Sequence, residues 1–268
     1  MSFSPRTIPF VKASACGNDF LLIDAALAPA DIAAFTRHIC DRHNGVGADG
    51  VEWMLPHSSA DGALRLINAD GSDAEISGNG TRCVAAYICA ERGGEKIKIQ
   101  TGAGLKTCSL ISRRNSEFEF EMEMGRATVG GELTVRFGEG EVHGVFVSMG
   151  NPHCVVFVSE FEQDWQTRAT AIQRDAQFTQ GVNVELVIAE SRNEIRVLFF
   201  ERGVGETQSS GTGSCASAVA AVSTGRADWP VHVHAPGGTQ TVRQEADHIL
   251  LRGPAQLLCR GDFFWIEP

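Results

Sequence analysis

The chain has 268 residues, of which 43% are hydrophobic and 21% are charged. This length and balance predict one large or two medium folded domains and exclude a disordered or collagen-like chain. The net charge of -10 would repel a phosphate backbone, so we expect no nucleic-acid partner. No apolar run approaches the roughly 18 residues of a membrane span. Met1–Arg6 lacks the charged-then-apolar pattern of a secretory signal. We therefore expect a cytoplasmic protein with no membrane partner.

Eight cysteines are spread along the chain without a single Cys-x-x-Cys pair, which argues against a structural zinc site. In a cytoplasmic protein the default state of such thiols is reduced. We therefore expect free thiols and no bound metal. The cysteines are Cys16, Cys40, Cys83, Cys89, Cys108, Cys154, Cys215 and Cys259.

The first half of the chain has the pattern of several strands and two helices. Short apolar or alternating runs predict the strands Phe20–Asp24, Leu64–Asn68, Lys96–Gln100 and Phe118–Met124. An amphipathic helix is expected after Asp31, whose side chain is a good N-cap. A second helix is expected over Thr81–Glu91. Since its residues are small and apolar on nearly all sides, this segment has the pattern of a helix surrounded by protein.

The second half repeats this arrangement. Strands are predicted over Cys154–Val158, Val184–Ala189, Ile195–Phe200 and Val231–His234. A helix is expected after Asp164, again a suitable N-cap. The residues of Ser214–Val222 are small and apolar on nearly all sides, so this segment predicts a second buried helix. Both halves are therefore rich in strands, and each is expected to enclose one helix.

Two glycine clusters, Ser77–Gly80 and Ser210–Gly213, lie 133 residues apart, which is nearly half the chain. A single match is weak, because glycine and asparagine are common in turns. Several matches at one offset predict a duplicated domain. We therefore predict an α/β protein of the α+β type, with two pseudo-symmetric halves. Each half is expected to be a curved, mainly antiparallel sheet or barrel around a central buried helix. The further matches at this offset are Gly17-Asn18 with Gly150-Asn151, Asp31 with Asp164, and Gly50 with Asn183.

Each predicted buried helix is entered through a glycine-rich turn. A helix N-terminus offers unpaired backbone N–H groups and the positive end of the helix dipole, so two such ends could hold one carboxylate. The alternative is that the glycines only form tight turns at buried helix ends. A dinucleotide site of the Gly-x-Gly-x-x-Gly type is excluded, since no strand–loop–helix–strand unit carries the required acidic residue.

Several motifs resemble those of diaminopimelate epimerases and follow the order of that family along nearly the whole chain. They are Ala15–Phe20, Arg42–Gly50, Asn68–Ser72, Gly78–Cys83, Met149–Cys154, Phe200–Thr207 and Gly211–Gly213. The resemblance implies an epimerase that needs no cofactor and interconverts LL- and meso-diaminopimelate in lysine and peptidoglycan biosynthesis. It also implies two pseudo-symmetric halves, which we expect at residues 1–126, with 257–268 returning to them, and 127–256. A homodimer is compatible with the resemblance.

The resemblance also implies roles for individual residues. The backbone of Gly78, Asn79, Gly211 and Thr212 would hold the reacting carboxylate, and Glu201 the α-ammonium group. A second set would fix the substrate, especially its distal amino-acid end. This set comprises Asn18, Asn68, Asn151, Asn183 and Arg202. Without the resemblance, each asparagine could equally be a turn residue that bonds its own backbone.

This sequence departs from the family at the two catalytic positions. In the family, two cysteines directly before the glycine turns act as base and acid, and here these positions are Ser77 and Ser210. Cys83 and Cys215 do not replace them, because they lie later in the sequence and do not correspond to each other at the offset of 133. Their pattern is that of small buried residues on apolar helices.

A thiol loses its proton easily at a helix N-terminus, whereas a serine hydroxyl needs a strong basic partner. His153 lies inside a recognised motif, but one histidine could serve one face of the substrate at most. We therefore expect this chain to bind the substrate well and to epimerise it poorly. Two origins of the serines stay open. Both cysteines could have been replaced deliberately to prevent a disulfide and trap the unreacted complex. The chain could also be a natural relative with altered chemistry.

Three other functions are alternatives. The first is a related racemase or dehydratase that acts on another amino acid, since loss of a thiol in the wider proline racemase superfamily accompanies elimination. The asparagine set argues against a proline-like substrate, which has no distal amino-acid end. A protein that only binds diaminopimelate is the second. A serine hydrolase is the third, and it is disfavoured because Ser210 lacks the Gly-x-Ser-x-Gly spacing.

Overall fold

The computed structural model describes residues 6–74, 76–137 and 140–266. The chain forms two compact units. Unit 1 consists of Met1–Met122 and Pro254–Pro268, and unit 2 of Glu123–Gly253. The limits expected from the sequence, after residues 126 and 256, stay a prediction. The prediction that the chain has no secretory signal was based on Met1–Arg6, of which Met1–Pro5 lies outside the described residues.

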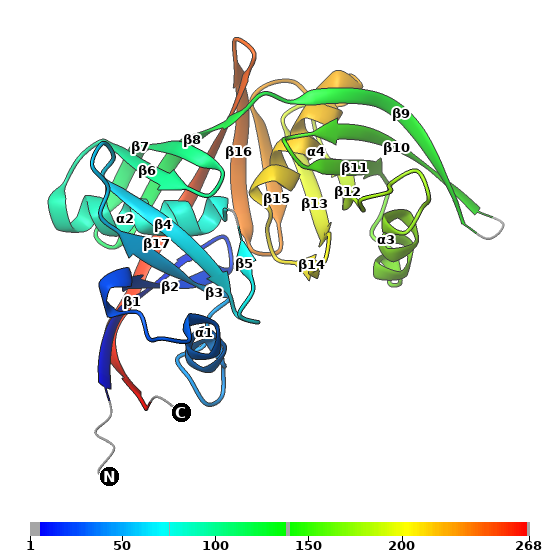
Figure 1. Cartoon of the computed structure of the whole chain (residues 1–268). Helices are drawn as coiled ribbons and strands as arrows, with labels where there is room; N and C mark the ends of the chain where they lie inside the picture. The colour runs from blue at the N-terminus through cyan, green and yellow to red at the C-terminus, as the bar shows by residue number, and fades with distance from the viewer. Residues whose placement is uncertain (1–5, 75, 138–139, 267–268) are drawn as a thin grey trace. The chain divides into compact units, whose positions relative to one another are not determined.

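In unit 1 the strands close into a barrel (Figure 1). The pairing runs β1-β2-β3-β4-β6-β7-β8-β17 and returns to β1, while the short β5 pairs with β4. Most neighbours are antiparallel, but β2–β3 and β4–β6 are parallel. The strands are β1 (Arg6–Ala15), β2 (Asn18–Asp24), β3 (Gly50–Leu55), β4 (Gly62–Asn68), β5 (Asp73–Ala74), β6 (Lys96–Thr101), β7 (Gly104–Arg114), β8 (Glu117–Gly125) and β17 (His248–Trp265).

Two α-helices of unit 1 differ in how much of their surface is buried. Helix α2 (Gly78–Arg92) contacts β1, β2 and β6 and has buried residues on every side, as its apolar pattern predicts. Helix α1 (Ile32–Cys40) packs one face against β3 and β4, where Phe35 and Trp53 have ring centroids 5.6 Å apart. A 3-10 turn, η1 (Ala25–Leu27), precedes α1.

Unit 2 repeats the pattern with a sheet in the order β9-β10-β11-β12-β13-β15-β16-β17. Its parallel pairs, β11–β12 and β13–β15, correspond to the two parallel pairs of unit 1. Helix α4 (Gly211–Ser223) is buried against this sheet, and α3 (Trp165–Gln173) contacts β9, β12 and β13. The remaining strands are β9 (Thr128–Phe137), β10 (Gly140–Ser148), β11 (Pro152–Phe157), β12 (Asn183–Ala189), β13 (Glu194–Glu201), β14 (Gly205–Thr207), β15 (Val231–Ala235) and β16 (Gly238–Glu245).

The predicted fold class is confirmed, since each unit is a curved, mainly antiparallel sheet with a buried helix. Two details were wrong. The buried helices begin at Gly78 and Gly211, three residues before the predicted starts, because the glycines form the first turn of each helix. Asp164 occupies the N-cap position of α3, but its side chain accepts no capping hydrogen bond. No helix in the described ranges combines the length and apolar character needed to cross a membrane.

Candidate functional site

In unit 1, Ser77 caps the N-terminus of α2. Its Oγ accepts the backbone N–H of Gly80 at 3.1 Å, and its carbonyl accepts the N–H of Thr81 at 2.8 Å. The backbone at Ser77 is extended, with φ -117° and ψ 121°, so the chain turns sharply into the helix. Gly78 and Asn79 therefore form the leading edge of the helix, where the positive end of the dipole favours an anion.

Asn79 is linked to a second predicted site residue. Its Nδ2 donates to Oδ1 of Asn18 at 3.4 Å. Its Oδ1 accepts from Nη2 of Arg82, a fully buried guanidinium whose Nε donates to the Pro254 carbonyl at 3.3 Å. The amide of Asn79 is thus held from the interior of the barrel and joined to β2.

Asp49 links Asn18 to the loop of Asn68. Its Oδ2 accepts from Nδ2 of Asn18 at 2.5 Å, and its carbonyl accepts from the N–H of Ala69 at 2.9 Å. Asn68 itself donates from Nδ2 to Oγ of Ser72 at 3.0 Å. Three of the predicted residues, Asn18, Asn68 and Asn79, therefore belong to one connected polar cluster beside the α2 N-terminus.

In unit 2, Ser210 caps α4 in the same way. Its Oγ accepts the N–H of Gly213 at 3.2 Å, and its carbonyl accepts the N–H of Ser214 at 2.9 Å. Asn151 donates from Nδ2 to Oγ1 of Thr212 at 3.3 Å. This bond joins positions 133 residues beyond Asn18 and Asn79, so each unit contains an equivalent hydrogen bond as well as an equivalent sequence pattern.

His153 lies in the interior of unit 2 and is fully buried. Its Nε2 lies 3.0 Å from Oδ1 of Asn151, and its Nδ1 lies 2.7 Å from Oε1 of Glu185, which is also buried. Burial raises the pKa of the Glu185 carboxyl, and the nearby His153 partly opposes this shift. A Glu185–His153–Asn151 chain therefore ends at Thr212, in the first turn of α4.

The other predicted residues of unit 2 lie around the ends of β12 and β13. Asn183 accepts the N–H of Arg202 at 2.9 Å and donates to the Pro152 carbonyl at 3.0 Å. Glu201 accepts from Oγ1 of Thr207 at 2.7 Å, and burial raises its pKa. The Arg202 side chain is exposed and donates to the Gln180 carbonyl at 2.8 Å.

Sequence reasoning missed two buried glutamates beneath the helix N-termini. Glu52 of β3 and Glu185 of β12 are each 1% exposed. A Cβ added at Gly80 would overlap Oε1 of Glu52, and one at Gly213 would lie 2.9 Å from Oε1 of Glu185. The signal was present, because these glutamates are also 133 residues apart. Cys83 and Cys215, which the sequence analysis did not expect to replace the missing thiols, are fully buried in their helices.

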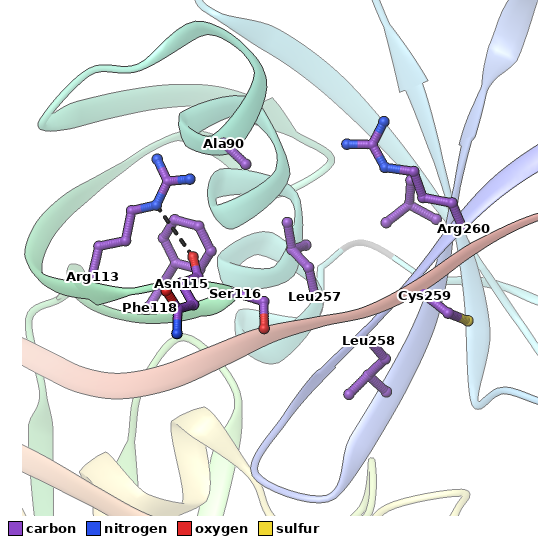
Figure 2. A pocket seen from close by; sticks show the side chains of 10 residues that line it. Ala90, Arg113, Asn115, Ser116, Phe118, Leu257, Leu258, Cys259 and Arg260 are labelled. Atoms are coloured by element: carbon purple, nitrogen blue, oxygen red, sulfur yellow. Dashed lines mark hydrogen bonds between the residues drawn. The ribbon is translucent and has the colours of Figure 1, made fainter.

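A surface hollow of about 340 Å³ in unit 1 lies away from this site. Figure 2 shows Ala90, Arg113, Phe118, Leu257 and Arg260 around it. Ala90 is near the C-terminal end of α2, about 18 Å along the axis from Gly78 at 1.5 Å per residue. The hollow therefore lacks the helix N-terminus that would bind an anion. Among the described residues, no group of three or more His, Cys, Asp and Glu side chains could hold a metal ion.

Comparison with known proteins gives a consistent result. The sequence pattern of the family described as diaminopimelate epimerase matches residues 10–130 and 145–258. The chain is 36% identical over 275 residues to the diaminopimelate epimerase of Pelotomaculum thermopropionicum, covering 95% of this chain and 98% of that protein. It is 37% identical over 280 residues to that of Desulforudis audaxviator, covering 96% and 99%.

Solved structures share the fold at low identity. A phenazine biosynthesis protein of the PhzF family from Bacillus anthracis has a TM-score of 0.74 and 16% identity, covering 97% of this chain and 99% of that one. A hydroxyproline epimerase from Agrobacterium vitis has a TM-score of 0.72 and 16% identity, covering 98% and 92%. On the sequence matches above, the chain belongs to the diaminopimelate epimerase family, a family of isomerases.

Proposed function

We propose that this chain is a cytoplasmic diaminopimelate epimerase scaffold that uses no cofactor and whose proton transfer is impaired by serine at both acid and base positions. The observation that carries the proposal is the matched pair of serine-capped helix N-termini, each hydrogen bonded through its second residue, Asn79 or Thr212, to an asparagine. The family relationship supports a small amino acid as the substrate. The proposed reaction involves no nucleic acid and no membrane.

The reaction needs a stabilised carbanion. Removal of the α-proton leaves an electron pair on Cα, which delocalises into the adjacent carboxylate. Two helix N-termini directed at that carboxylate would stabilise the negative charge. In the proposal, the backbone of Gly78 and Asn79 from unit 1 and of Gly211 and Thr212 from unit 2 binds it.

The remaining roles follow the chemistry of each residue. Glu201 binds the α-ammonium group, and the asparagines with Arg202 bind the distal amino-acid end. A buried polar array of this kind discriminates strongly, because a substrate that lacks one group leaves its partners unpaired. In the proposal this distal set comprises Asn18, Asn68, Asn151, Asn183 and Arg202.

Inversion requires a base on one face of Cα and an acid on the other. Ser77 and Ser210 stand at these positions, and a serine hydroxyl is a far weaker acid than a thiol. The chain should therefore bind diaminopimelate and epimerise it slowly. A protein that only binds diaminopimelate, or a serine-containing relative that acts on another amino acid, is the alternative.

The first test follows α-proton exchange by NMR while diaminopimelate is incubated in heavy water. The chain with serine at both positions is compared with a double variant, Ser77→Cys with Ser210→Cys, and with the matched single variants. We expect rapid exchange and epimerisation from the double variant, and slow or no epimerisation from the serine-containing chain.

The outcomes separate the alternatives. The absence of both α-proton exchange and diaminopimelate binding in both chains would contradict the substrate assignment. Epimerisation by the serine-containing chain as fast as by the double variant would contradict the proposed impairment. Binding to both chains without exchange, measured by calorimetry, would favour a binding protein.

A further inference from the structure

The two buried glutamates are matched in position but differ in their partners. Glu185 bonds to His153 through Oε1. The position in unit 1 that corresponds to His153 is Phe20, so Glu52 has no such partner. Oε1 of Glu52 has no hydrogen-bond partner among the described residues, although the side chain is 1% exposed. A buried carboxyl oxygen without a partner is costly, so its retention calls for a reason.

The Glu52 side chain points at the Ser77 turn. The Cβ position of Gly80 overlaps Oε1 of Glu52 and lies 3.3 Å from Cβ of Ser77, so the carboxyl and the serine flank the same point. Only the absence of a side chain at Gly80 allows the carboxyl to approach the first turn of α2. The Oγ of Ser77 accepts from Gly80, which leaves its hydroxyl proton available for donation.

The other surroundings of Glu52 are mostly apolar. Its cross-strand neighbours are Leu22 of β2 and Leu66 of β4, both buried. The α2 helix adds the thiol of Cys83, whose pKa is raised by its own burial and further by Glu52. Arg82, Cys16 and Asp19 also affect the pKa of this thiol, so these are the other ionisable groups of this region. Burial raises the pKa of Glu52 to about 8, with no compensating charge.

We propose that Glu52 is a positioning residue that acts through Ser77, receiving and returning the proton of the serine hydroxyl. Unit 1 would then carry a carboxyl–serine pair on its face of the substrate, whereas the glutamate of unit 2 is already engaged by His153. This inference rests on the proposed function for its role in the reaction. The pairing itself is a property of unit 1 and can be tested without substrate.

The proton transfer balances in both directions. When Ser77 removes the α-proton, the Cα–H bond breaks and its electron pair stays on Cα, delocalised into the carboxylate. The proton joins Oγ of Ser77 as the original hydroxyl proton passes to the ionised Glu52. In the reverse direction, protonated Glu52 returns a proton to Oγ while the proton of Ser77 forms the new Cα–H bond.

The test places a reporter thiol at position 77. Ser77→Cys is made in a Cys259→Ser background, which removes the exposed native cysteine. The rate of alkylation by iodoacetamide is then followed against pH by mass spectrometry of the peptide that contains position 77. Because interacting groups titrate as a pair, we expect a broad two-step profile. Glu52→Gln should convert it to one step and move its midpoint down by about one pH unit.

Matched controls exclude a general effect on folding. The same thiol at position 210, made by Ser210→Cys, should show no shift on Glu52→Gln. Glu52→Asp should restore a two-step profile, and circular dichroism checks that each variant is folded. An unchanged profile at position 77, or an equal shift at both positions, would overturn the proposal.

The exchange experiment then distinguishes the two levels of argument. In the double cysteine variant, Glu52→Gln should lower the rate of α-proton exchange at least tenfold. This effect is expected for the diastereomer of diaminopimelate whose α-proton faces unit 1, and not for the other. If the double variant epimerises diaminopimelate but Glu52→Gln does not change the pH profile of alkylation at position 77, the proposed function stands and this inference fails. If the profile responds but diaminopimelate never exchanges, the pairing stands and the proposed function fails.

Discussion

Gly80 shows how one residue determines the surroundings of the candidate site. Its Cβ position is occupied by the Glu52 carboxyl, whereas a Cβ at Gly78 would make ordinary van der Waals contacts with Cε of Met122 at 3.5 Å and Nη1 of Arg82 at 4.0 Å. Gly80→Ala must therefore displace a buried side chain, and we expect it to lower the free energy of unfolding by about 1–3 kcal/mol. Gly78→Ala is the matched control and should leave stability unchanged or raise it by up to about 1 kcal/mol. Urea denaturation measures both, and equal losses would contradict the packing argument.

The buried carboxyl of Glu52 also predicts how stability changes with pH. Its pKa is about 8 in the folded chain, against an ordinary value of 4.5, because burial disfavours the charged form. Between these values the folded chain holds a proton that the unfolded chain has lost. Stability should therefore fall as pH rises from about 4.5 to about 8, by about 1.4 kcal/mol per unit from this group.

Glu52→Gln should remove this part of the fall, because the amide does not titrate. The measurement is the difference in unfolding free energy between the native chain and the variant at the two ends of the window. The difference is needed because burial also raises the pKa of Glu185 and Glu201. A difference that does not change with pH would show that Glu52 is not buried in its neutral form.

The sequence indicated the two serine turns, because glycine clusters at a fixed offset are visible without a structure. It could not reveal Arg82 or Glu52 as buried ionisable groups, since such residues are nearly always exposed. Burial depends on tertiary contacts, such as the bond from Arg82 to the carbonyl of Pro254, 172 residues away. The roles of the predicted substrate-binding residues stay predictions.

At the scale of elements, α1 and α3 differ in how their first turns are satisfied. Oδ1 of Asp31 accepts the N–H of Ala34 at 2.9 Å, while Asp164 makes no capping bond. Asp31→Ala should lower the unfolding free energy by about 1 kcal/mol, and Asp164→Ala should change it by much less. Chemical denaturation compares the two. Equal effects would show that the cap contributes little and that helix dipole effects dominate.

The sequence predicted the helices well and several strands poorly. The pattern for α2 and α4 was clear because both are apolar on all sides, but glycine lowers helix propensity and hid their first turns. Gly130, Gly131 and Gly144 interrupt the alternation in β9 and β10, so these paired strands were not predicted. Pairing between distant segments compensates for the weak local pattern.

At the scale of the whole molecule, the cysteines give a simple check. All eight are free, and Cys259 is exposed while the other seven are buried. A thiol reagent should react rapidly with one cysteine in the native chain and with eight after denaturation. Cys259→Ser should remove the fast reaction. Rapid reaction of a second thiol would show that one of the two units is more open around that cysteine than the structure indicates.

Strand β17 has a consequence for the order in which the protein folds during synthesis. It begins in unit 2 and ends in unit 1, where Phe263, Phe264 and Trp265 pair with the first residues of β1. Unit 2 is a continuous stretch of chain, but the barrel of unit 1 needs the last strand to close. N-terminal domains usually fold first on the ribosome. Here the part that is synthesised first must wait, its apolar strands incompletely covered, until β17 has left the exit tunnel.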